Sequence, residues 1–244
     1  MHAVTSRTAL VTGANKGIGF EISRQLGRAG IHVLLGARDP TRGKAAASLL
    51  HAEGIAARFI HIDLENSATI QAAATVIEKE HGRLDILVNN AGCRRDGDGL
   101  PGKASIDAVR RVFEVNFFGT LAVTQAMLPL LRQSISARIV NVSSELGSLA
   151  LNGKAGWEFA HVKLLGYNTS KAALNMLTVL LAAELHDAGI KVNSANPGFT
   201  ATDLNGHRGH QSVEQGAVAA TRLALLEDDG PTGGFFNAHR QEPW

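Results

Sequence analysis

The feature that most constrains the fold is a repeated alternation of short apolar runs with longer segments of helical pattern. The apolar runs are mostly continuous, which is typical of strands covered by helices on both faces. Such alternation produces parallel sheets with right-handed crossovers. The sequence therefore predicts an α/β protein with one doubly wound parallel sheet. Strands are expected at 9–11, 31–37, 56–62, 84–88, 138–142 and 190–195. Helices are expected at 41–53, 67–81, 106–132 and 167–188, with Pro129 bending or ending the third of these.

Length and composition restrict the class of protein. At 244 residues without a repeat or linker, the chain is expected to form one domain over residues 1–244. Its single cysteine excludes an intrachain disulfide and fits a reducing compartment. No apolar stretch approaches the roughly 20 residues of a membrane span. A net charge of +2 with dispersed basic residues is not typical of nucleic-acid binding. We therefore expect a soluble, cytoplasmic protein with no membrane or nucleic-acid partner.

A glycine-rich turn follows the first expected strand and precedes a helix that extends to about residue 26. Its glycines, Gly13, Gly17 and Gly19, have the spacing G-x-x-x-G-x-G. Gly13 can leave the strand with backbone angles that other residues avoid. The missing side chains of Gly17 and Gly19 let a diphosphate, or the strand beneath, approach the start of the helix. Unpaired N–H groups and the positive end of the helix dipole favour phosphate there. The turn therefore predicts a dinucleotide pyrophosphate site.

Ligands of a doubly wound sheet bind beyond the carboxyl ends of its strands, so the residues that follow each strand are candidates. Arg38 and Asp39 follow the second strand. Arg38 and Lys16, which lies inside the glycine turn, offer two cations for a 2′-phosphate and favour NADP(H). Asp39 stands close to where an acid that holds the ribose diol of NAD(H) is expected. A third possibility is that Arg38 and Asp39 form an exposed loop pair.

The third and fourth strands are followed by further candidates. Asp63 and Leu64 come after the third strand. Asp63 could accept a hydrogen bond from an adenine amino group, or it could cap the next helix. The segment Asn89-Asn90-Ala91-Gly92 follows the fourth strand and offers small, turn-forming residues where the backbone must pass close to a cofactor. The alternative is an ordinary turn.

Six motifs occur along the chain in an order that is typical of one family. They are Thr12-Gly-Ala-Asn-Lys-Gly-Ile-Gly19, Asn89-Asn-Ala-Gly92, Asn116, Ser144, Tyr167-x-x-x-Lys171 and Pro197-Gly198. Together they resemble the short-chain dehydrogenase/reductase family over essentially the whole chain. The resemblance implies a single Rossmann-type domain that binds a nicotinamide cofactor.

The resemblance implies roles for four catalytic candidates. Tyr167 would donate a proton to a carbonyl oxygen or accept one from an alcohol. Lys171, one helical turn away, would lower the pKa of Tyr167 by its charge and hold the nicotinamide ribose. Ser144 would stabilise the charge that develops on the substrate oxygen, and Asn116 would fix a water in the proton relay. Because Ser143 and Ser144 are neighbours at a strand end, only one should face the site, and the resemblance favours Ser144.

The resemblance also gives the expected cofactor contacts. The segment from Pro197 to Thr202 is similar to one that meets the carboxamide of the nicotinamide, although Thr200 and Thr202 could instead cap the next short helix. The full set of expected contacts is Gly13, Asn15, Lys16, Gly17, Ile18, Gly19, Arg38, Asp63, Leu64, Asn90, Ala91, Gly92, Tyr167, Lys171, Pro197, Gly198, Thr200 and Thr202.

One departure from the family pattern concerns the substrate side. Ser144 and Tyr167 are 23 residues apart, which is more than in many members. The extra residues 151–164 are expected to form a wall of the substrate pocket, and residues 203–216 a mobile lid. The insertion, together with Asn15-Lys16 in the turn and the Pro-Trp ending, resembles the carbonyl-reductase-like branch. Because an insertion there can interfere with subunit packing, a homodimer and a homotetramer both stay open.

Three further fragments are assigned no site. Glu158-x-x-His161 and His207-x-x-His210 have the spacing of metal ligands. The first has no partners in the chain, and the second fits a lid better. Cys93 could line the pocket, but no base or helix terminus clearly activates its thiol. No metal site is therefore predicted.

These observations predict an NADP(H)-dependent oxidoreductase that interconverts a ketone or aldehyde with its alcohol, with reduction as the preferred direction. The alternatives are an NAD-dependent alcohol dehydrogenase that uses Asp39, and a regulatory protein that senses NADP(H) without turnover. The intact set of Asn116, Ser144, Tyr167 and Lys171 favours an enzyme, because a sensor has no need of all four.

Overall fold

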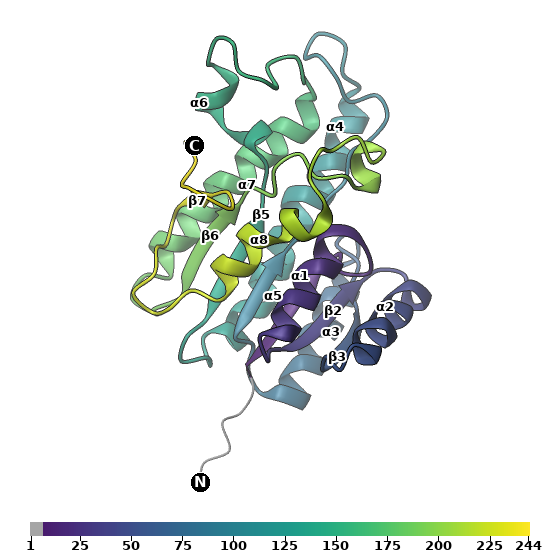
Figure 1. The fold of residues 1–244 in the computed structure, drawn as a ribbon, viewed down its shortest axis with the longest axis vertical. Coiled ribbons are helices and arrows are strands. Elements are labelled where there is room, and N and C mark those ends of the chain that lie inside the picture. Colours follow the sequence, from purple (N-terminus) through teal and green to yellow (C-terminus); the bar gives the residue numbers. More distant parts are fainter. Residues whose placement is uncertain (1–6) are drawn as a thin grey trace.

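The computed structural model describes residues 7–244, which contain one seven-stranded parallel sheet of order β3-β2-β1-β4-β5-β6-β7 (Figure 1). The strands are β1 (Thr8–Thr12), β2 (His32–Ala37), β3 (Ala57–His61), β4 (Ile86–Asn89), β5 (Arg138–Val142), β6 (Lys191–Ala195) and β7 (Phe235–Phe236). The predicted fold class is confirmed. The sequence predicted the first six strands but not β7, whose two residues pair with Ser194 and Ala195 of β6.

Successive residues of the central strands enter two hydrophobic cores, one on each face of the sheet. Leu10 pairs with Leu34 and Leu87 in register and joins the core on one face. The next residue, Val11, belongs to the core on the other face. Because both faces are apolar, the strands show continuous hydrophobic runs.

Three helices cover each face of the sheet (Figure 1). One layer consists of α1 (Gly17–Arg28), α2 (Pro40–Ala52) and α8 (Val213–Ala224). The other consists of α3 (Ser67–His81), α5 (Thr120–Leu131) and α7 (Leu165–Glu184). The helix α7 begins two residues before the predicted start and ends four residues before the predicted end.

The long helix expected at 106–132 consists of three continuous pieces. They are α4 (Ile106–Phe113), a π-helical turn η1 (Glu114–Gly119) and α5. The backbone stays helical through Pro129, and α5 ends two residues later, at Leu131. Asn116 lies in the π-helical turn, a local geometry that is frequent at functional sites.

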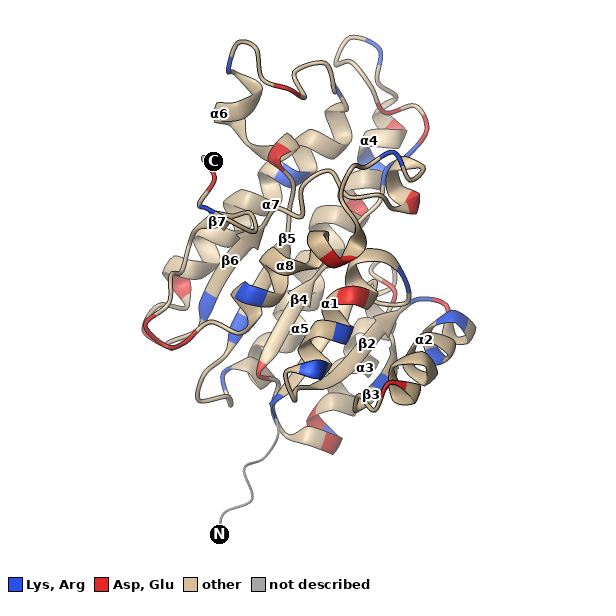
Figure 2. Ribbon diagram, viewed as in Figure 1, with Lys and Arg blue, Asp and Glu red and all other residues tan. Residues whose placement is uncertain are grey.

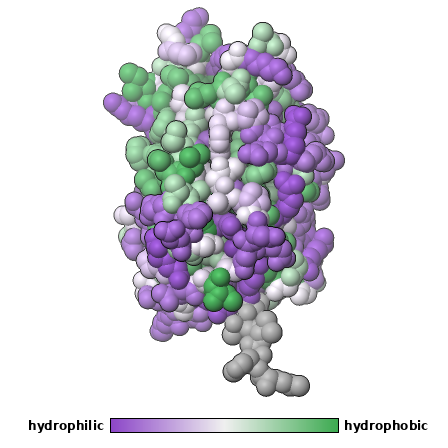
Figure 3. Space-filling model, turned by 90° about the vertical axis from the view of Figure 1, so that its left-hand side faces the viewer, coloured by the Kyte–Doolittle hydropathy of each residue, from purple (hydrophilic) through white to green (hydrophobic). Residues whose placement is uncertain are grey.

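The connections at the carboxyl ends of the strands form the upper end of the molecule in Figure 1. They include the 3₁₀ turn η2 (Glu145–Gly147), the short helix α6 (Leu149–Asn152) and the 3₁₀ turn η3 (Asp203–Asn205). Charged residues are dispersed over the surface (Figure 2), and one side of the molecule carries a group of apolar residues at mid-height (Figure 3). Within residues 7–244, none of the helices combines the length and apolar character needed to cross a membrane.

Candidate active site

A cleft of about 820 Å³ lies at the carboxyl ends of the central strands. Most of the predicted cofactor contacts line it, namely Gly13, Asn15, Lys16, Gly17, Ile18, Gly19, Arg38, Asp63, Leu64, Asn90, Ala91, Gly92, Tyr167, Lys171, Pro197 and Thr202. Gly198, Thr200, Asn116 and Ser144 are not among the lining residues. The structure thus brings together residues that are up to 189 positions apart in the sequence, at the edge where a doubly wound sheet binds ligands.

The glycine turn has the geometry that the sequence predicted. Gly13 has a φ of +63°, which other residues rarely adopt, and a Cβ there would lie 2.9 Å from the Cα of Ala91. A Cβ on Gly19 would lie 2.3 Å from the side-chain nitrogen of Asn90. The turn and the loop after β4 can therefore pack closely only because these two side chains are absent.

Asn90 joins the loop after β4 to the glycine turn. Its side-chain nitrogen donates to the carbonyl oxygens of Thr12 at 2.9 Å and Gly13 at 3.2 Å. In return, the Thr12 hydroxyl accepts hydrogen bonds from the backbone N–H groups of Asn90 and Ala91, both at 3.0 Å. The segment is therefore more than an ordinary turn, because it fixes the floor of the cleft.

The start of α1 differs from the starts of several other helices. Asp39, Asn66, Ser105 and Ser212 cap α2, α3, α4 and α8 with their side chains. In the described part of the chain, no side chain caps α1. Its first N–H groups and positive dipole end therefore face the cleft and suit an anionic ligand.

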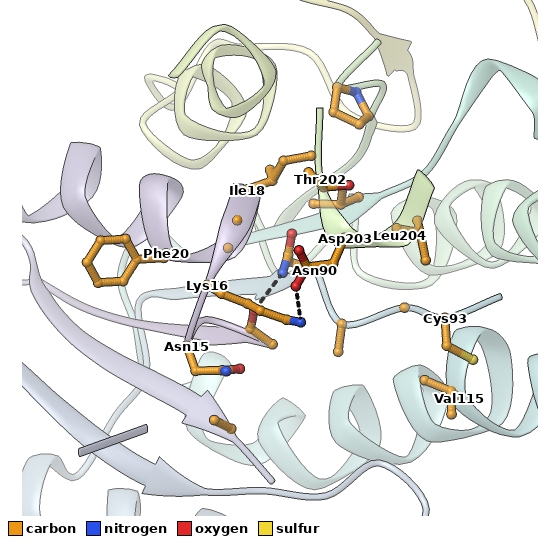
Figure 4. Close-up of a pocket in the computed structure, with 18 of the residues that line it drawn as sticks. Asn15, Lys16, Ile18, Phe20, Asn90, Cys93, Val115, Thr202, Asp203 and Leu204 are labelled. Atoms are coloured by element: carbon orange, nitrogen blue, oxygen red, sulfur yellow. Dashed lines mark hydrogen bonds and ion pairs between the residues drawn. The ribbon is translucent and has the colours of Figure 1, made fainter. Parts of the chain in front are cut away.

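The candidates for cofactor selectivity occupy different positions. Arg38 is exposed on the cleft wall, with its guanidinium 4.0 Å from the Glu65 carboxylate. Asp39 is not among the lining residues, and its carboxylate accepts a hydrogen bond from the Arg42 N–H at 3.0 Å. Lys16 forms an ion pair with Asp203 across the mouth of the cleft (Figure 4). This arrangement disfavours Asp39 as a ligand of the ribose diol.

Asp63 does not cap the helix that follows it, so that alternative is wrong. Asn66 caps α3. The Asp63 carboxylate accepts a hydrogen bond from the Glu65 N–H at 3.1 Å, and its backbone N–H donates to Thr69 at 2.9 Å. The residue lines the cleft, which is compatible with the adenine contact predicted for it.

Three of the four predicted catalytic side chains lie close together. Ser144 lies close enough to Tyr167 to lower the pKa of its phenol against the effect of burial. The Lys171 ammonium lies 5.8 Å from the centre of the Tyr167 ring and donates to the Val142 carbonyl oxygen at 2.8 Å. The 3₁₀ turn after Ser144 packs tightly on α7, because a Cβ on Gly147 would lie 2.7 Å from the Lys171 backbone.

Burial dominates the titration of the two ionisable groups. It raises the pKa of Tyr167, and the neighbouring Ser144 side chain and the charge of Arg94 act in the opposite direction. It also lowers the pKa of Lys171 to about 8. The sequence predicted that Lys171 would lower the pKa of Tyr167, but in the protein alone that pKa is raised. The physical reason is that both groups are removed from water.

The other polar candidates take supporting positions. The hydroxyl of Ser143 is buried and donates to the Asn175 side chain at 2.6 Å. Ser143 lines the cleft and Ser144 does not, but Ser144 is the serine that lowers the pKa of Tyr167. Asn116 is also buried. Its side chain accepts from the Cys93 N–H at 2.8 Å and donates to the Cys93 carbonyl and the Ser170 hydroxyl, each at 3.1 Å.

The two threonines of the segment after β6 differ. The hydroxyl of Thr200 is buried and donates to the Pro197 carbonyl oxygen at 3.0 Å, so it stabilises its own loop. Thr202 lines the cleft and also caps η3, where its side chain and that of Asn205 form a capping box. The two roles proposed for Thr202 are therefore compatible.

Residues 7–212 match the family model described as short chain dehydrogenase. The chain belongs to the short-chain dehydrogenase family. It is 34% identical to carbonyl reductase (NADPH) 1 of Mus musculus, with 97% of this chain and 98% of that enzyme covered. It is 35% identical to (+)-neomenthol dehydrogenase of Arabidopsis thaliana, with 97% of this chain and 98% of that enzyme covered. The solved structure of NADPH-bound carbonyl reductase from chicken fatty liver is 27% identical, with a TM-score of 0.85 and coverage of 98% and 99%. The predicted resemblance to the carbonyl-reductase-like branch is confirmed.

In this short-chain dehydrogenase, the insertion and the lid meet through aromatic rings. The centroid of Phe159, in the insertion, lies 5.8 Å from those of Trp157 and Phe199. Phe199 lies 5.8 Å from His210 in the lid. The last four residues of the predicted lid range 203–216 belong to α8, which begins at Val213. The insertion and the segment before the lid therefore form one packed rim.

In this short-chain dehydrogenase, the histidines of the two fragments with metal-ligand spacing have local partners. His161 contacts the carbonyl oxygen of Glu158, and His207 pairs with Asp203 at 2.7 Å. Residues 7–244 contain no group of three His, Cys, Asp or Glu side chains that could hold a metal ion. Burial raises the pKa of the Cys93 thiol, so this cysteine is not activated.

Sequence reasoning missed two residues that build the site of this short-chain dehydrogenase. The Asp98 carboxylate accepts hydrogen bonds from the backbone N–H groups of Gly166 at 2.7 Å and Tyr167 at 2.9 Å. It therefore caps α7 from a distant loop, and no local pattern indicates that. Arg94 lines the cleft near Tyr167. Arg94 belongs to the loop after β4, and this position was a readable signal because residues there border the site.

Proposed function

We propose that the chain is an NADP(H)-dependent oxidoreductase that interconverts a ketone or aldehyde with its alcohol. The observation that carries the proposal is that Tyr167 and Lys171 line the same cleft as the glycine turn, with Ser144 beside Tyr167. The names of the relatives, carbonyl reductase (NADPH) 1 and (+)-neomenthol dehydrogenase, support this chemistry.

The residues of the cleft fit a nicotinamide dinucleotide. The closely packed glycine turn and the uncapped start of α1 suit the pyrophosphate. Lys16 and Arg38 are cations that suit a 2′-phosphate, and Asp39 is committed to capping α2. We therefore favour NADP(H) over NAD(H). When bound, the nicotinamide supplies or accepts the hydride.

The chain's own groups would manage the proton and the charge on the substrate oxygen. The Tyr167 hydroxyl, with Ser144 nearby, would donate the proton to a carbonyl oxygen. The Ser144 hydroxyl would stabilise the charge on that oxygen. Lys171 would hold the ribose and keep a positive charge near the phenol. Asn116, whose hydrogen bonds fix Cys93 and Ser170, would position the loop beside the reacting atoms.

The first test is a binding titration with NADPH and NADH, followed by turnover on a panel of ketones and aldehydes. We expect tighter binding of NADPH and its oxidation by at least one carbonyl compound. Tyr167→Phe should keep NADPH affinity and lose turnover by roughly 10³-fold, because the proton donor is gone. Retained turnover would overturn the role of Tyr167. NADPH binding without turnover of any carbonyl compound would favour the sensor alternative.

Arg38→Ala tests the choice of cofactor. Loss of a charge-assisted contact to the 2′-phosphate should weaken NADPH binding by about tenfold or more and leave NADH binding within about twofold. An equal loss for both cofactors would return the choice to Asp39. Arg42→Ala is the matched control, because Arg42 is exposed on α2 and is not among the residues that line the cleft.

We also propose self-association as a homodimer or homotetramer. Met176, Val179 and Leu180 leave an apolar face of α7 exposed, which supports this proposal. Light scattering during size-exclusion chromatography measures the mass, and a monomer at micromolar concentration would contradict it. The cytoplasmic location expected from the single cysteine stays a prediction.

A further inference from the structure

A second cavity adjoins the catalytic cleft, and three of its seven lining residues are arginines. It has a volume of about 410 Å³ and lies between the loop after β4 and the lid. The loop contributes Arg94, Arg95 and Asp96, and the lid contributes Arg208 together with the segment 204–206. Figure 2 shows basic positions on loops at this upper end of the molecule. Because the lining contains three arginines and one aspartate, its net positive charge favours the binding of an anion.

Unlike Lys16, two of the three arginines, Arg94 and Arg208, form no ion pair with the part of the chain that the structure describes. Within residues 7–244, Arg94 has no carboxylate within 4 Å and makes no hydrogen bond through its side chain. The nearest carboxylate to Arg95 is Glu65, at 3.9 Å. The Nε of Arg208 donates to the Asn205 carbonyl oxygen at 2.9 Å, which leaves its two terminal nitrogens for a ligand. A guanidinium with free donors matches the two oxygens of a carboxylate.

The cavity is also next to the reacting atoms. Arg94 lines both this cavity and the catalytic cleft, and its charge lowers the pKa of Tyr167 against the effect of burial. Lys16 and Arg38, the candidates for the 2′-phosphate, line the cleft but not this cavity. An anion bound by Arg94 would therefore lie near Tyr167.

The loop that carries the arginines is fixed at both ends. The Asn116 side chain holds the backbone N–H and carbonyl of Cys93. The Asp98 carboxylate holds the first turn of α7. Arg94 lies between these two attachments, so the backbone that carries it is held before a ligand arrives. Such preorganisation reduces the entropy cost of binding.

We infer that Arg94, Arg95 and Arg208 form an anion subsite beside Tyr167, and that the preferred substrate carries a carboxylate in addition to its carbonyl group. The inference rests on the proposed function and names its substrate class as oxo acids. The competing source of the anion is a phosphate of the cofactor, and the experiment separates the two.

The test compares oxo acids with their neutral methyl esters under NADPH oxidation. In these pairs the carbonyl group is at C2, C4 or C5, with the carboxyl carbon counted as C1. The panel therefore samples several distances between the carbonyl group and the carboxylate. For each pair, the measured quantity is the ratio of kcat/KM for the acid to kcat/KM for the ester. This ratio cancels any common effect of Arg94 on Tyr167. Arg94→Gln should lower the ratio at least 30-fold for the best pair, Arg94→Lys should restore part of it, and Arg208→Gln should lower it less.

The control variant is Arg132→Gln, an exposed arginine at the end of α5 that is not among the residues lining either cavity. It should leave the ratio unchanged. If Arg94→Gln lowers the rates of acid and ester equally, the subsite is overturned while the proposed function stands. If Arg94→Gln raises the KM for NADPH and leaves the ratio unchanged, the arginines serve the cofactor and the inference is wrong.

A binding measurement keeps the inference separate from the proposed function. Calorimetry compares pentanoate with pentanamide on the protein saturated with NADP⁺. We expect the acid to bind at least tenfold more tightly than the amide, and Arg94→Gln to remove that difference. If no ester or ketone is turned over but this difference is found, the proposed function fails and the anion subsite stands. Equal binding of acid and amide to the unaltered protein would overturn the subsite.

Discussion

A buried cation lies at each end of strand β5, and the two cations differ in the number of hydrogen bonds that they donate. At the amino end, the guanidinium of Arg138 donates to the carbonyl oxygens of Leu226 and Ala137, both at 2.9 Å, and to Asp228 at 2.7 Å. At the carboxyl end, the ammonium of Lys171 makes one hydrogen bond, to Val142. Burial lowers the pKa of Lys171 to about 8.

The difference separates a structural charge from a functional one. Arg138 has a partner for each of its three nitrogens, so its burial connects β5 to the segment before β7. Lys171 has donors left over, and it lines the cleft beside Tyr167. A buried charge with too few partners costs stability. Such groups are frequent at functional sites, where the cost is accepted for the chemistry.

The largest expected effect comes from Lys171→Met. Removal of the ammonium should lower kcat/KM for carbonyl reduction by roughly 10³-fold. The free energy of unfolding should stay unchanged or rise by about 1 kcal/mol, because a poorly partnered buried charge is lost. Kinetics with NADPH and thermal unfolding measure the two effects. A marked fall in the melting temperature would show that Lys171 stabilises the fold as Arg138 does.

Tyr167 allows a direct spectroscopic check of Lys171→Met, because it is the only tyrosine in the chain. Its ionisation can be followed by ultraviolet absorbance without interference from another phenol. In the protein without cofactor, burial should keep its pKa above the ordinary value. In Lys171→Met the pKa of Tyr167 should stay close to that of the unaltered protein, because Lys171, whose pKa is about 8, is already neutral at the pH where Tyr167 ionises.

Arg138→Met is expected to have the opposite pattern. The carbonyl groups of Leu226 and Ala137 would lose their donor in the protein interior, which should lower the free energy of unfolding by about 2–4 kcal/mol. The kcat of the folded enzyme should stay within about twofold, since Arg138 lies at the far end of the strand from the cleft. Arg132→Met, at an exposed position, is the matched control. Equal unfolding free energies for the two variants would contradict the structural role.

The sequence predicted the parts of this molecule that depend on local patterns. The glycine turn, six strands and the i, i+4 spacing of Tyr167 and Lys171 are written in short segments. The parallel order of the sheet follows from the alternation of strands and helices. The residues after each strand were good candidates for the cleft, because the carboxyl ends of parallel strands meet at one edge.

The remaining features depend on contacts between distant segments. Asp98 caps α7 over a separation of 69 residues, and β7 has only two residues that become a strand by pairing with β6. The chain of buried polar groups from Asn89 through Asn141 to Thr178 likewise joins three separate elements. The predicted direction of the Tyr167 pKa shift was also wrong, because the sequence indicates which charges are near but not how much water the fold removes.

The smallest predicted effect concerns Glu145, which extends the comparison from cations to carboxylates. Glu21 is buried on α1 and pairs with Arg24 and Gln25. Within residues 7–244, no cation pairs with Glu145, which directly follows Ser144. Burial, with smaller contributions from Glu242 and Glu158, raises the pKa of Glu145 to about 7. Glu145 is thus the acidic counterpart of Lys171, a charge held near the site with too few partners.

Because its pKa is raised on folding, protonated Glu145 favours the folded state below about pH 4.5, and that advantage is lost as the pH rises through about 7. Glu145→Gln removes the titration. At pH 5 the variant and the unaltered protein should therefore differ little. At pH 8 the variant should be more stable by about 1–2 kcal/mol after allowance for partial exposure, which corresponds to a rise of roughly 2–6 °C in melting temperature. Melting curves from pH 5 to 8.5 measure the difference, with Glu78→Gln on the exposed side of α3 as the control. A difference that does not grow with pH would mean that Glu145 is ionised without cost, and that the lack of a partner around it has no energetic consequence.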